Sequence, residues 1–258
     1  MRFASLGSGS EGNGLVVEAG GSRVLLDCGF SPRETSRRLA RLGLQPADLS
    51  GIVVTHEHSD HAGGVFALAR KHALRVWITH GTLAALRDAG SQVDSAAEIS
   101  LIRGEADFSV GGVQVFPYTV PHDAREPVQF VLSDGVKRLG VLTDAGCSTP
   151  RVESMLSACE ALVLETNHDL ALLWEGDYPP ALKARVAGRL GHLDNATAAR
   201  ILAAIDARKL QHVIAAHLSR KNNTPELARA ALAAALGGDE RMIGVASQED
   251  GFGWREIK

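Results

Sequence analysis

Three histidines, an aspartate and a glutamate fall within six consecutive residues, His56-Glu57-His58-Ser59-Asp60-His61. Imidazole and carboxylate groups together suit zinc, manganese or iron, and the absence of cysteine argues against a closed structural zinc finger. His56 and His58 are two residues apart, so their side chains can face the same way. The adjacent Asp60 and His61 diverge unless the loop curls around a second centre. The spacing therefore favours two metal ions over one, and over a solvated polar loop.

The residues on either side of this hexamer predict how it is positioned. The apolar run 51–55 before it is typical of a buried strand, and Gly63-Gly64 followed by the apolar run 65–69 indicates the start of a helix. We therefore expect a tight loop between a strand and a helix, where a rigid scaffold can aim several side chains at one point.

Further candidate ligands stand at the ends of three other predicted strands. His122 follows the predicted strand 113–119, Asp144 follows an apolar run that ends at Thr143, and His217 closes the predicted strand 213–217. Each residue alone is a weak signal, because caps and turns use the same residue types. The repetition of a strand followed by a ligand at four places predicts one shared metal site.

The composition limits the class of protein. A chain of 258 residues with 45% hydrophobic content can bury one large core or two modest ones. A net charge of -3 excludes a strongly basic protein that coats nucleic acid, but not an enzyme that grips a phosphate through metal ions. Three cysteines fit a reduced protein without a disulfide framework. We see neither a signal peptide nor an apolar run of the roughly 20 residues that a membrane helix needs, and we expect a cytoplasmic protein with no membrane partner.

Hydrophobic patterns along the chain predict an α/β fold. Ser31-Pro32-Arg33-Glu34 predicts a helix that begins with a capping box and ends at Gly43. The other predicted helices are 195–207 and 225–235, and the predicted strands are 2–6, 15–19, 23–27, 52–55, 76–79, 107–110, 113–119, 128–133, 138–143, 161–165, 213–217 and 242–246. Because no composition shift marks a linker, we predict a single domain, residues 1–258, with two sheets packed face to face and helices outside.

Taken in order, the candidate ligands resemble the signature of the metallo-β-lactamase-fold hydrolases: an early Asp, His-x-His-x-Asp-His, then His, Asp and His. In this chain the series is Asp27, His56-x-His58-x-Asp60-His61, His122, Asp144 and His217. The resemblance spans nearly the whole chain. It implies an αββα sandwich with two divalent metal ions, zinc or manganese, at one edge between the ends of the sheets.

The resemblance also implies a role for each residue of the series. One metal ion would be held by His56, His58 and His122. The second would be held by Asp60, His61 and His217, and Asp144 would bridge the two. Asp27 and Glu165 would support these ligands from outside through hydrogen bonds. The alternative interpretation of Asp27, which we favour less, is an ordinary turn residue at the end of a strand.

Differences within the superfamily narrow the resemblance. One major class of secreted β-lactamases has Cys where this chain has Asp144, and flavodiiron-type redox members have Glu where this chain has His58. The interval between Asp144 and His217 is too short for the β-CASP insertion of RNase J-like nucleases. These differences favour a compact hydrolase.

Four further stretches bear on the substrate: Ser-Gly-Ser-x-Gly-Asn in residues 8–13, Glu-x-Asn-His-Asp in 165–169, Gly-His-Leu-x-Asn in 191–195, and His-Leu-Ser-x-x-Asn-Asn in 217–223. Together they resemble the YycJ (WalJ, VicX) branch of the superfamily, although Asp194 stands where that branch more often has Ser. The branch is similar to the tRNase Z and RNase J phosphodiesterases, and it implies 5′ exonuclease activity on DNA. Expected substrate contacts are Ser8, Ser10, Asn13, His168, His192 and Ser219. The glycine-rich stretch is equally consistent with a flexible hairpin turn.

The chemistry that we expect is hydrolysis of a nucleic-acid phosphodiester, with DNA favoured over RNA. The metal ions would lower the pKa of a bridging water and clamp the scissile phosphate. Asp60 would take the proton of that water, and His192 would stabilise the phosphoryl oxygens or protonate the leaving oxygen. The sequence leaves open a hydrolase of a small phosphodiester, thioester or lactone, and a regulatory module without turnover. It leaves the oligomeric state open.

Overall fold

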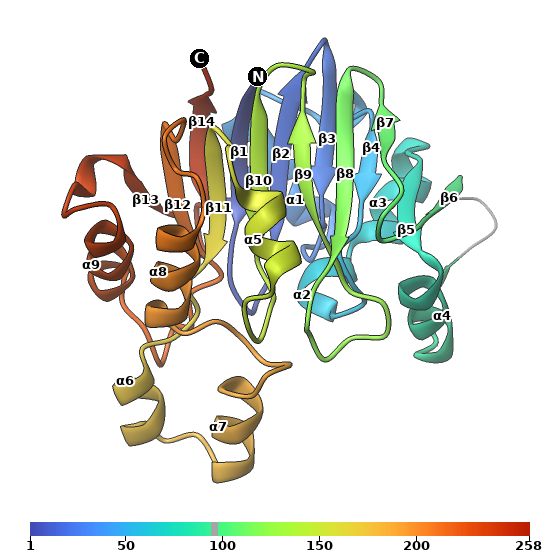
Figure 1. Ribbon diagram of the computed structural model, residues 1–258. Coiled ribbons are helices and arrows are strands. Elements are labelled where there is room, and N and C mark those ends of the chain that lie inside the picture. The colour runs from blue at the N-terminus through green and yellow to red at the C-terminus, as the bar shows by residue number, and fades with distance from the viewer. Residues whose placement is uncertain (94–97) are drawn as a thin grey trace.

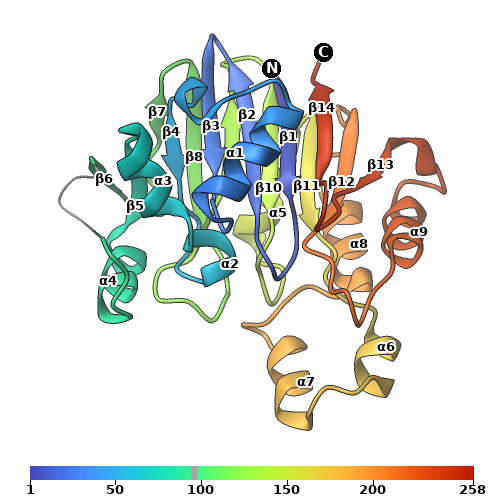
Figure 2. The same ribbon diagram turned by 180° about the vertical axis from the view of Figure 1, so that it is seen from behind.

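A computed structural model of the chain describes residues 1–93 and 98–258. Two seven-stranded sheets pack face to face, and helices cover the outer face of each (Figures 1 and 2). The predicted αββα sandwich is therefore confirmed.

The first sheet contains the N-terminal strands and the last strand of the chain. Its order is β14 (Phe252–Glu256), β1 (Arg2–Gly7), β2 (Gly14–Ala19), β3 (Ser22–Leu26), β4 (Gly51–Val53), β5 (Val76–Thr79) and β6 (Ile99–Ile102). Pairing is antiparallel from β14 to β3 and parallel from β3 to β6.

The second sheet repeats this division into two halves. Its order is β13 (Ile243–Val245), β12 (His212–Ala216), β11 (Ala161–Glu165), β10 (Arg138–Leu142), β9 (Val128–Ser133), β8 (Val113–Thr119) and β7 (Phe108–Val110). Pairing is parallel from β13 to β10 and antiparallel from β10 to β7. In a parallel group the carboxyl ends of all strands lie at one edge of the sheet, which is where α/β proteins build their sites.

Three layers of apolar side chains hold the sandwich together. Between the sheets, Phe3, Val53, Phe130 and Val141 belong to one buried cluster. Each outer face has its own cluster, which contains side chains from the helices that cover that sheet.

The helices α1 (Pro32–Arg41), α3 (Val65–His72) and α4 (His80–Asp88) contribute to the cluster on the first sheet, and α5 (Pro150–Leu156), α8 (Asn195–Ala204) and α9 (Pro225–Ala235) to the cluster on the second. The remaining helical segments are α2 (Ser59–Ala62), α6 (Leu170–Glu175), α7 (Pro180–Val186) and two 3₁₀ turns, Pro46–Asp48 and Glu240–Met242. In Figure 1, α6 and α7 extend below the body of the sandwich.

Two sequence predictions about helix ends need correction. Ser31 caps α1 by accepting a hydrogen bond from the Glu34 amide, but the Glu34 carboxylate bonds Arg37 and Arg38, so only half of the capping box forms. The helix predicted at 195–207 ends at Ala204, because the Asp206 backbone instead bonds Ser157 Oγ and the Ala158 amide. Among the helices in residues 1–93 and 98–258, none is long and apolar enough to cross a membrane.

Candidate metal centre

The hexamer loop is fixed by backbone hydrogen bonds to two neighbouring segments. The amide of Cys28 donates to the carbonyl of His61 at 2.8 Å, the amide of Asn13 donates to the carbonyl of Asp60 at 2.7 Å, and the amide of Gly64 donates to the carbonyl of Cys28 at 2.7 Å. A Cβ at Gly64 would lie 1.8 Å from the carbonyl oxygen of Phe30, so this close approach requires glycine. The loop therefore holds its side chains on a rigid backbone.

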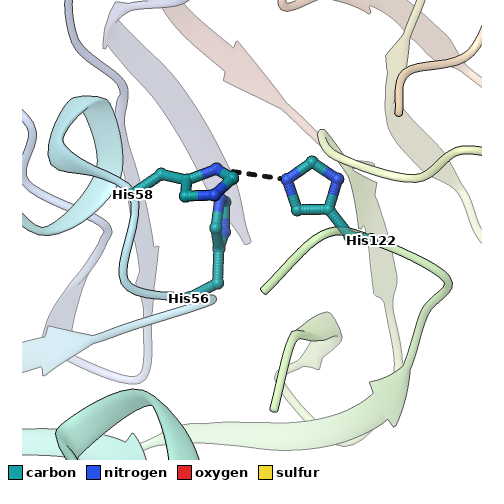
Figure 3. A group of neighbouring side chains, drawn as sticks. All are labelled: His56, His58 and His122. Atoms are coloured by element: carbon teal, nitrogen blue, oxygen red, sulfur yellow. Dashed lines mark hydrogen bonds between the residues drawn. The ribbon is translucent and has the colours of Figure 1, made fainter. Parts of the chain in front are cut away.

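Three histidines form the first group of candidate metal donors (Figure 3). His122 Nε2 lies 3.3 Å from His58 Nδ1, and His56 Nε2 is buried and has no hydrogen-bond partner among the described residues. The other ring nitrogens of His56 and His122 lie near Thr55 Oγ1, at 2.9 Å, and the Gly191 carbonyl, at 3.1 Å. These outer contacts orient both rings so that their remaining nitrogens converge.

A second group consists of Asp60, His61 and His217. Asp60 Oδ2 lies 3.3 Å from the Nε2 atom of each histidine. Asp27 accepts hydrogen bonds from the amide and hydroxyl of Thr55, and its Oδ2 lies 2.8 Å from His61 Nδ1. Asp27 thus directs the other nitrogen of His61 toward Asp60, which is the contact expected of a supporting residue.

Asp144 lies between the two groups. Its Oδ2 is 3.0 Å from His61 Nε2, and its Oδ1 is 3.8 Å from His122 Nε2. Despite the short distance to His61, Oδ2 makes no well-aligned hydrogen bond within the described structure, although Asp144 is only 1% exposed. A buried carboxylate oxygen close to an imidazole nitrogen but misaligned with it is the geometry of two ligands that face one ion.

The protonation states of His56 and Asp144 suit metal binding as they stand. Burial lowers the pKa of His56 well below its usual value, so its imidazole is neutral. Burial alone would raise the pKa of Asp144, but the neighbouring His217 and His61 outweigh it and hold that pKa well below the usual range. Metal ligands must be neutral imidazoles and ionised carboxylates. For His61 and His217, burial would lower the pKa, but the Asp144 carboxylate outweighs it and raises the pKa, to about 10 for His217, so a metal ion that binds there displaces a proton from each ring. With donor atoms in each group within 4.8 Å of one another, these nitrogen and oxygen donors fit divalent transition-metal ions.

His192 forms a further group of candidate donors with Asp144, Glu165 and His217, and it is held by Glu165. His192 Nδ1 lies 2.7 Å from Glu165 Oε1, while Glu165 Oε2 accepts hydrogen bonds from the amides of Ala145 and Leu193. Burial would lower the pKa of His192, but the Glu165 carboxylate outweighs it and raises that pKa. With Nδ1 bound to Glu165, Nε2 remains for a ligand in the cleft.

A cleft of about 310 Å³ opens over these residues. It is lined by residues of the hexamer, of the loops that carry Asp123, Asp144 and Asn167, and of α7 and the turns that flank it. Of the expected substrate contacts, Ser10, His192 and Ser219 line it.

Three other expected contacts, Ser8, Asn13 and His168, do not line this cleft. All three are buried. Ser8 Oγ accepts a hydrogen bond from the His217 amide at 2.8 Å, and Asn13 Nδ2 lies 3.2 Å from Asp60 Oδ2 and 3.0 Å from His61 Nε2. Ser8 and Asn13 therefore contact candidate metal ligands from positions outside the cleft lining, where they can fix the positions of those ligands.

Among the residues that line the cleft, several with polar side chains had no role expected from the sequence, including Asp123, Asn167, Tyr178 and Arg185. Asp123 and Asn167 lie inside motifs that had been recognised, next to His122 and His168, so their neighbours were a usable signal. Tyr178 and Arg185 belong to a stretch without any motif, and only the folded chain brings them to the cleft.

Comparison with known proteins places this geometry in context. Residues 22–217 match the family described as the beta-lactamase superfamily domain. The chain is 34% identical over 245 residues to the exodeoxyribonuclease YycJ of Bacillus anthracis, covering 95% of this chain and 92% of that protein. It is 30% identical over 247 residues to the exodeoxyribonuclease WalJ of Streptococcus pneumoniae, covering 95% and 91%.

Solved structures share the fold at low sequence identity. The metallo-beta-lactamase fold protein YhfI of Bacillus subtilis matches with a TM-score of 0.75 and 15% identity over 99% of both chains. Zn(2+)-bound PqqB of Methylobacterium extorquens matches with a TM-score of 0.72 and 18% identity over the full length of both. At such identities the likeness extends to the architecture alone.

Proposed function

Because the chain belongs to the beta-lactamase superfamily and is similar to exodeoxyribonucleases over almost its full length, we propose that it is a metal-dependent exonuclease that hydrolyses phosphodiester bonds of DNA. The proposal that DNA is the substrate rests on the 34% identity to the exodeoxyribonuclease YycJ, which extends over 95% of the chain. The buried donor groups around Asp144 support hydrolysis as the reaction class, because they suit metal ions that polarise a phosphate.

We assign His56, His58 and His122 to one metal ion and Asp60, His61 and His217 to a second, with Asp144 shared by both. The donor chemistry suits zinc or manganese. When bound, two such ions supply Lewis acidity that polarises the phosphoryl oxygens and makes hydroxide available near neutral pH. Residues 1–258 then act as one domain, which is supported by the apolar cluster that both sheets share.

The chain's own residues move the protons in this proposal. The Asp60 carboxylate accepts a proton from the attacking water. His192, oriented by Glu165, donates from Nε2 to the leaving oxygen, and its raised pKa favours the protonated form that this step needs. Ser10 and Ser219 line the cleft and offer hydroxyl donors to a phosphate oxygen.

A second candidate is hydrolysis of a small substrate such as a cyclic phosphodiester, a thioester or a lactone. The volume of the cleft favours it, because about 310 Å³ is near the lower end of the range typical of small-molecule sites. The net charge of -3 also offers little general attraction for a polymer of phosphates.

A single panel of substrates tests both candidates. Purified protein loaded with zinc or with manganese is given 5′-phosphorylated DNA, the matching RNA, bis-p-nitrophenyl phosphate and a thioester. We expect release of mononucleotides from DNA at a higher kcat/KM than for any other substrate. Fast turnover of the thioester with inert DNA would overturn the proposal.

A further inference from the structure

The segment of residues 170–190, which contains α6 and α7, forms a second wall of the cleft opposite the metal donors. Its two ends are tied to the body by backbone hydrogen bonds, from Asp169 to the Asn222 carbonyl at 2.8 Å and from Asp123 to the Leu190 carbonyl at 2.9 Å. Between these ties the segment projects from the sandwich (Figures 1 and 2). Leu182, Arg185 and Val186 of α7 nevertheless line the cleft, together with Tyr178 just before it.

Arg185 bridges from this wall to the metal donors through Asp123. Its Nε lies 2.7 Å from Asp123 Oδ2. The other oxygen of Asp123 is 3.5 Å from His122 Nε2 and 3.8 Å from His58 Nε2. A carboxylate therefore occupies the space between a guanidinium and the three-histidine group, so an anionic group of a substrate that displaced it would lie beside both.

The pair between Arg185 and Asp123 is suited to exchange. The Arg185 side chain is 63% exposed, and exposed ion pairs contribute little to stability, so opening the pair costs little. A phosphate offers arginine two parallel charge-assisted hydrogen bonds. The phosphate of a bound nucleotide can therefore replace Asp123 as the partner of Arg185.

Tyr178 supplies a surface for a base. Its ring is partly buried and lines the cleft, and the ammonium of Lys221 lies 5.6 Å from the ring centroid. Aromatic rings in sites that bind single strands stack on bases of any sequence. The cleft of about 310 Å³ has room for one nucleotide at a time, since it matches the smallest small-molecule sites.

We propose that the α6–α7 segment holds the terminal nucleotide of a DNA strand, with Tyr178 stacked on its base and Arg185 bound to its phosphate in place of Asp123. The inference rests on the proposed exonuclease function and adds to it the residues that select a single-stranded end. In this binding mode the terminal base is held by stacking rather than by hydrogen bonds to its edges. Cleavage should therefore depend little on the DNA sequence.

An abasic end tests the stacking. Two single-stranded oligonucleotides are compared, one with an ordinary terminal nucleotide and one whose terminal nucleotide lacks its base. We expect the wild-type protein to prefer the ordinary end by about 5- to 100-fold in kcat/KM, the range that stacking of one base provides. Tyr178→Ala should lose that preference, and Tyr178→Phe should keep it because the ring remains.

Trp174→Ala is the matched control, because Trp174 is an exposed aromatic residue of the same segment that does not line the cleft. It should keep the preference for the ordinary end. An unchanged preference in a folded, metal-loaded Tyr178→Ala protein would overturn the role of Tyr178. If the wild-type protein cleaves neither oligonucleotide, the exonuclease proposal itself fails, which is a different outcome.

A charge-neutral linkage tests Arg185. In one oligonucleotide, the phosphate group of the terminal nucleotide that Arg185 is proposed to bind is replaced with an uncharged methylphosphonate. This change removes the negative charge that the guanidinium would bind. Binding of the oligonucleotide with the native phosphate should weaken about 10-fold or more in Arg185→Ala, and binding of the neutral one should change much less. Arg189→Ala, an exposed arginine of the same segment outside the cleft lining, should bind both as the wild type does. Equal weakening for both oligonucleotides in Arg185→Ala would overturn the phosphate contact.

Discussion

One wall of the cleft is made of strand ends and the hexamer loop, and the other wall is made of α7 and the turn before it, in the α6–α7 segment that projects from the sandwich. Five of the seven candidate metal donors are buried, among them His61 at 0% exposed, Asp144 at 1% and His217 at 3%, whereas His58 and Asp60 are partly exposed in the cleft. Across the cleft, Arg185 is largely exposed and α7 contains no buried residue in the described structure. The two walls differ in how firmly the body of the protein holds them.

This difference matches two different tasks. Metal ligands have to be held in fixed positions before the ion arrives, and here buried hydrogen bonds from His61 Nδ1 to Asp27 and from the His217 amide to Ser8 hold two of the candidate ligands. The backbone contributes strain as well, since Asp27 and His217 have φ of 60° and 55°, in the region that favours glycine. A wall that admits successive nucleotides, as we propose for the α6–α7 segment, must instead adapt. Short helices with few buried contacts open locally at low free energy.

The largest effect should follow from removing the residue that both donor groups share. Asp144→Ala should lose most of its bound metal and reduce turnover by about 10³-fold or more, because one buried carboxylate faces both groups. Elemental analysis and kcat measure the two effects. Asp206→Ala, a surface aspartate paired with Arg208, is the control and should bind metal normally. Full occupancy of two metal sites in Asp144→Ala would contradict the bridging assignment.

The next largest loss of turnover should come from His192, which lies on the wall that contains the candidate metal donors but is not proposed as a metal ligand. His192→Ala should keep its metal and its fold but lose about 10²–10⁴-fold in kcat, the usual range for a positioned acid or base. KM should change much less, because the contact strengthens in the transition state. His80→Ala, an exposed histidine outside the cleft lining, serves as the control. Full-speed turnover in a metal-loaded His192→Ala protein would exclude the role.

A smaller effect should follow from weakening the support behind the ligands. Asp27→Asn keeps the size of the side chain but replaces one acceptor oxygen with an amide, so His61 Nδ1 or Thr55 loses its partner. Metal affinity should fall about 10- to 100-fold, as it does when outer partners of metal ligands are removed. A chelator competition titration measures the affinity, and circular dichroism checks the fold. An unchanged affinity would mean that Asp27 only shapes the turn.

The same contrast explains what the sequence could predict. The strands that build the rigid wall have strong apolar patterns, and their ends are marked by histidine or aspartate, so the fold and the donor series were accessible from the sequence. The edge strands β6 and β14 were missed because they are short and contain only one buried residue between them, so they lack a clear apolar alternation. The helices α4, α5, α6 and α7 were missed as well. Each has nine residues or fewer, which is too short for a clear helical period.

The residues of the α6–α7 segment that line the cleft could not be predicted, for a different reason. Tyr178 and Arg185 reach the site because the chain leaves the sandwich after β11 and returns before α8, and this path depends on tertiary ties at both ends. Ser8 and Asn13 illustrate the converse. Their residue types suggested contact with a substrate, but burial against His217 and Asp60 directs their polar atoms to the protein.

The smallest expected effect tests whether Arg185 of the α6–α7 segment binds a DNA phosphate through its charge. Each phosphate contact to a single strand contributes about 0.7 to the slope of log affinity against log salt concentration. Arg185→Ala should therefore bind DNA with a slope shallower by about 0.7. Raising the salt fourfold would then weaken its binding about 2- to 3-fold less than that of the wild type. Arg189→Ala should keep the wild-type slope, because Arg189 lies on the same segment but outside the cleft lining. Equal slopes for wild type and Arg185→Ala would mean that the guanidinium stays paired with Asp123 when DNA binds, so the helical wall would act through shape alone.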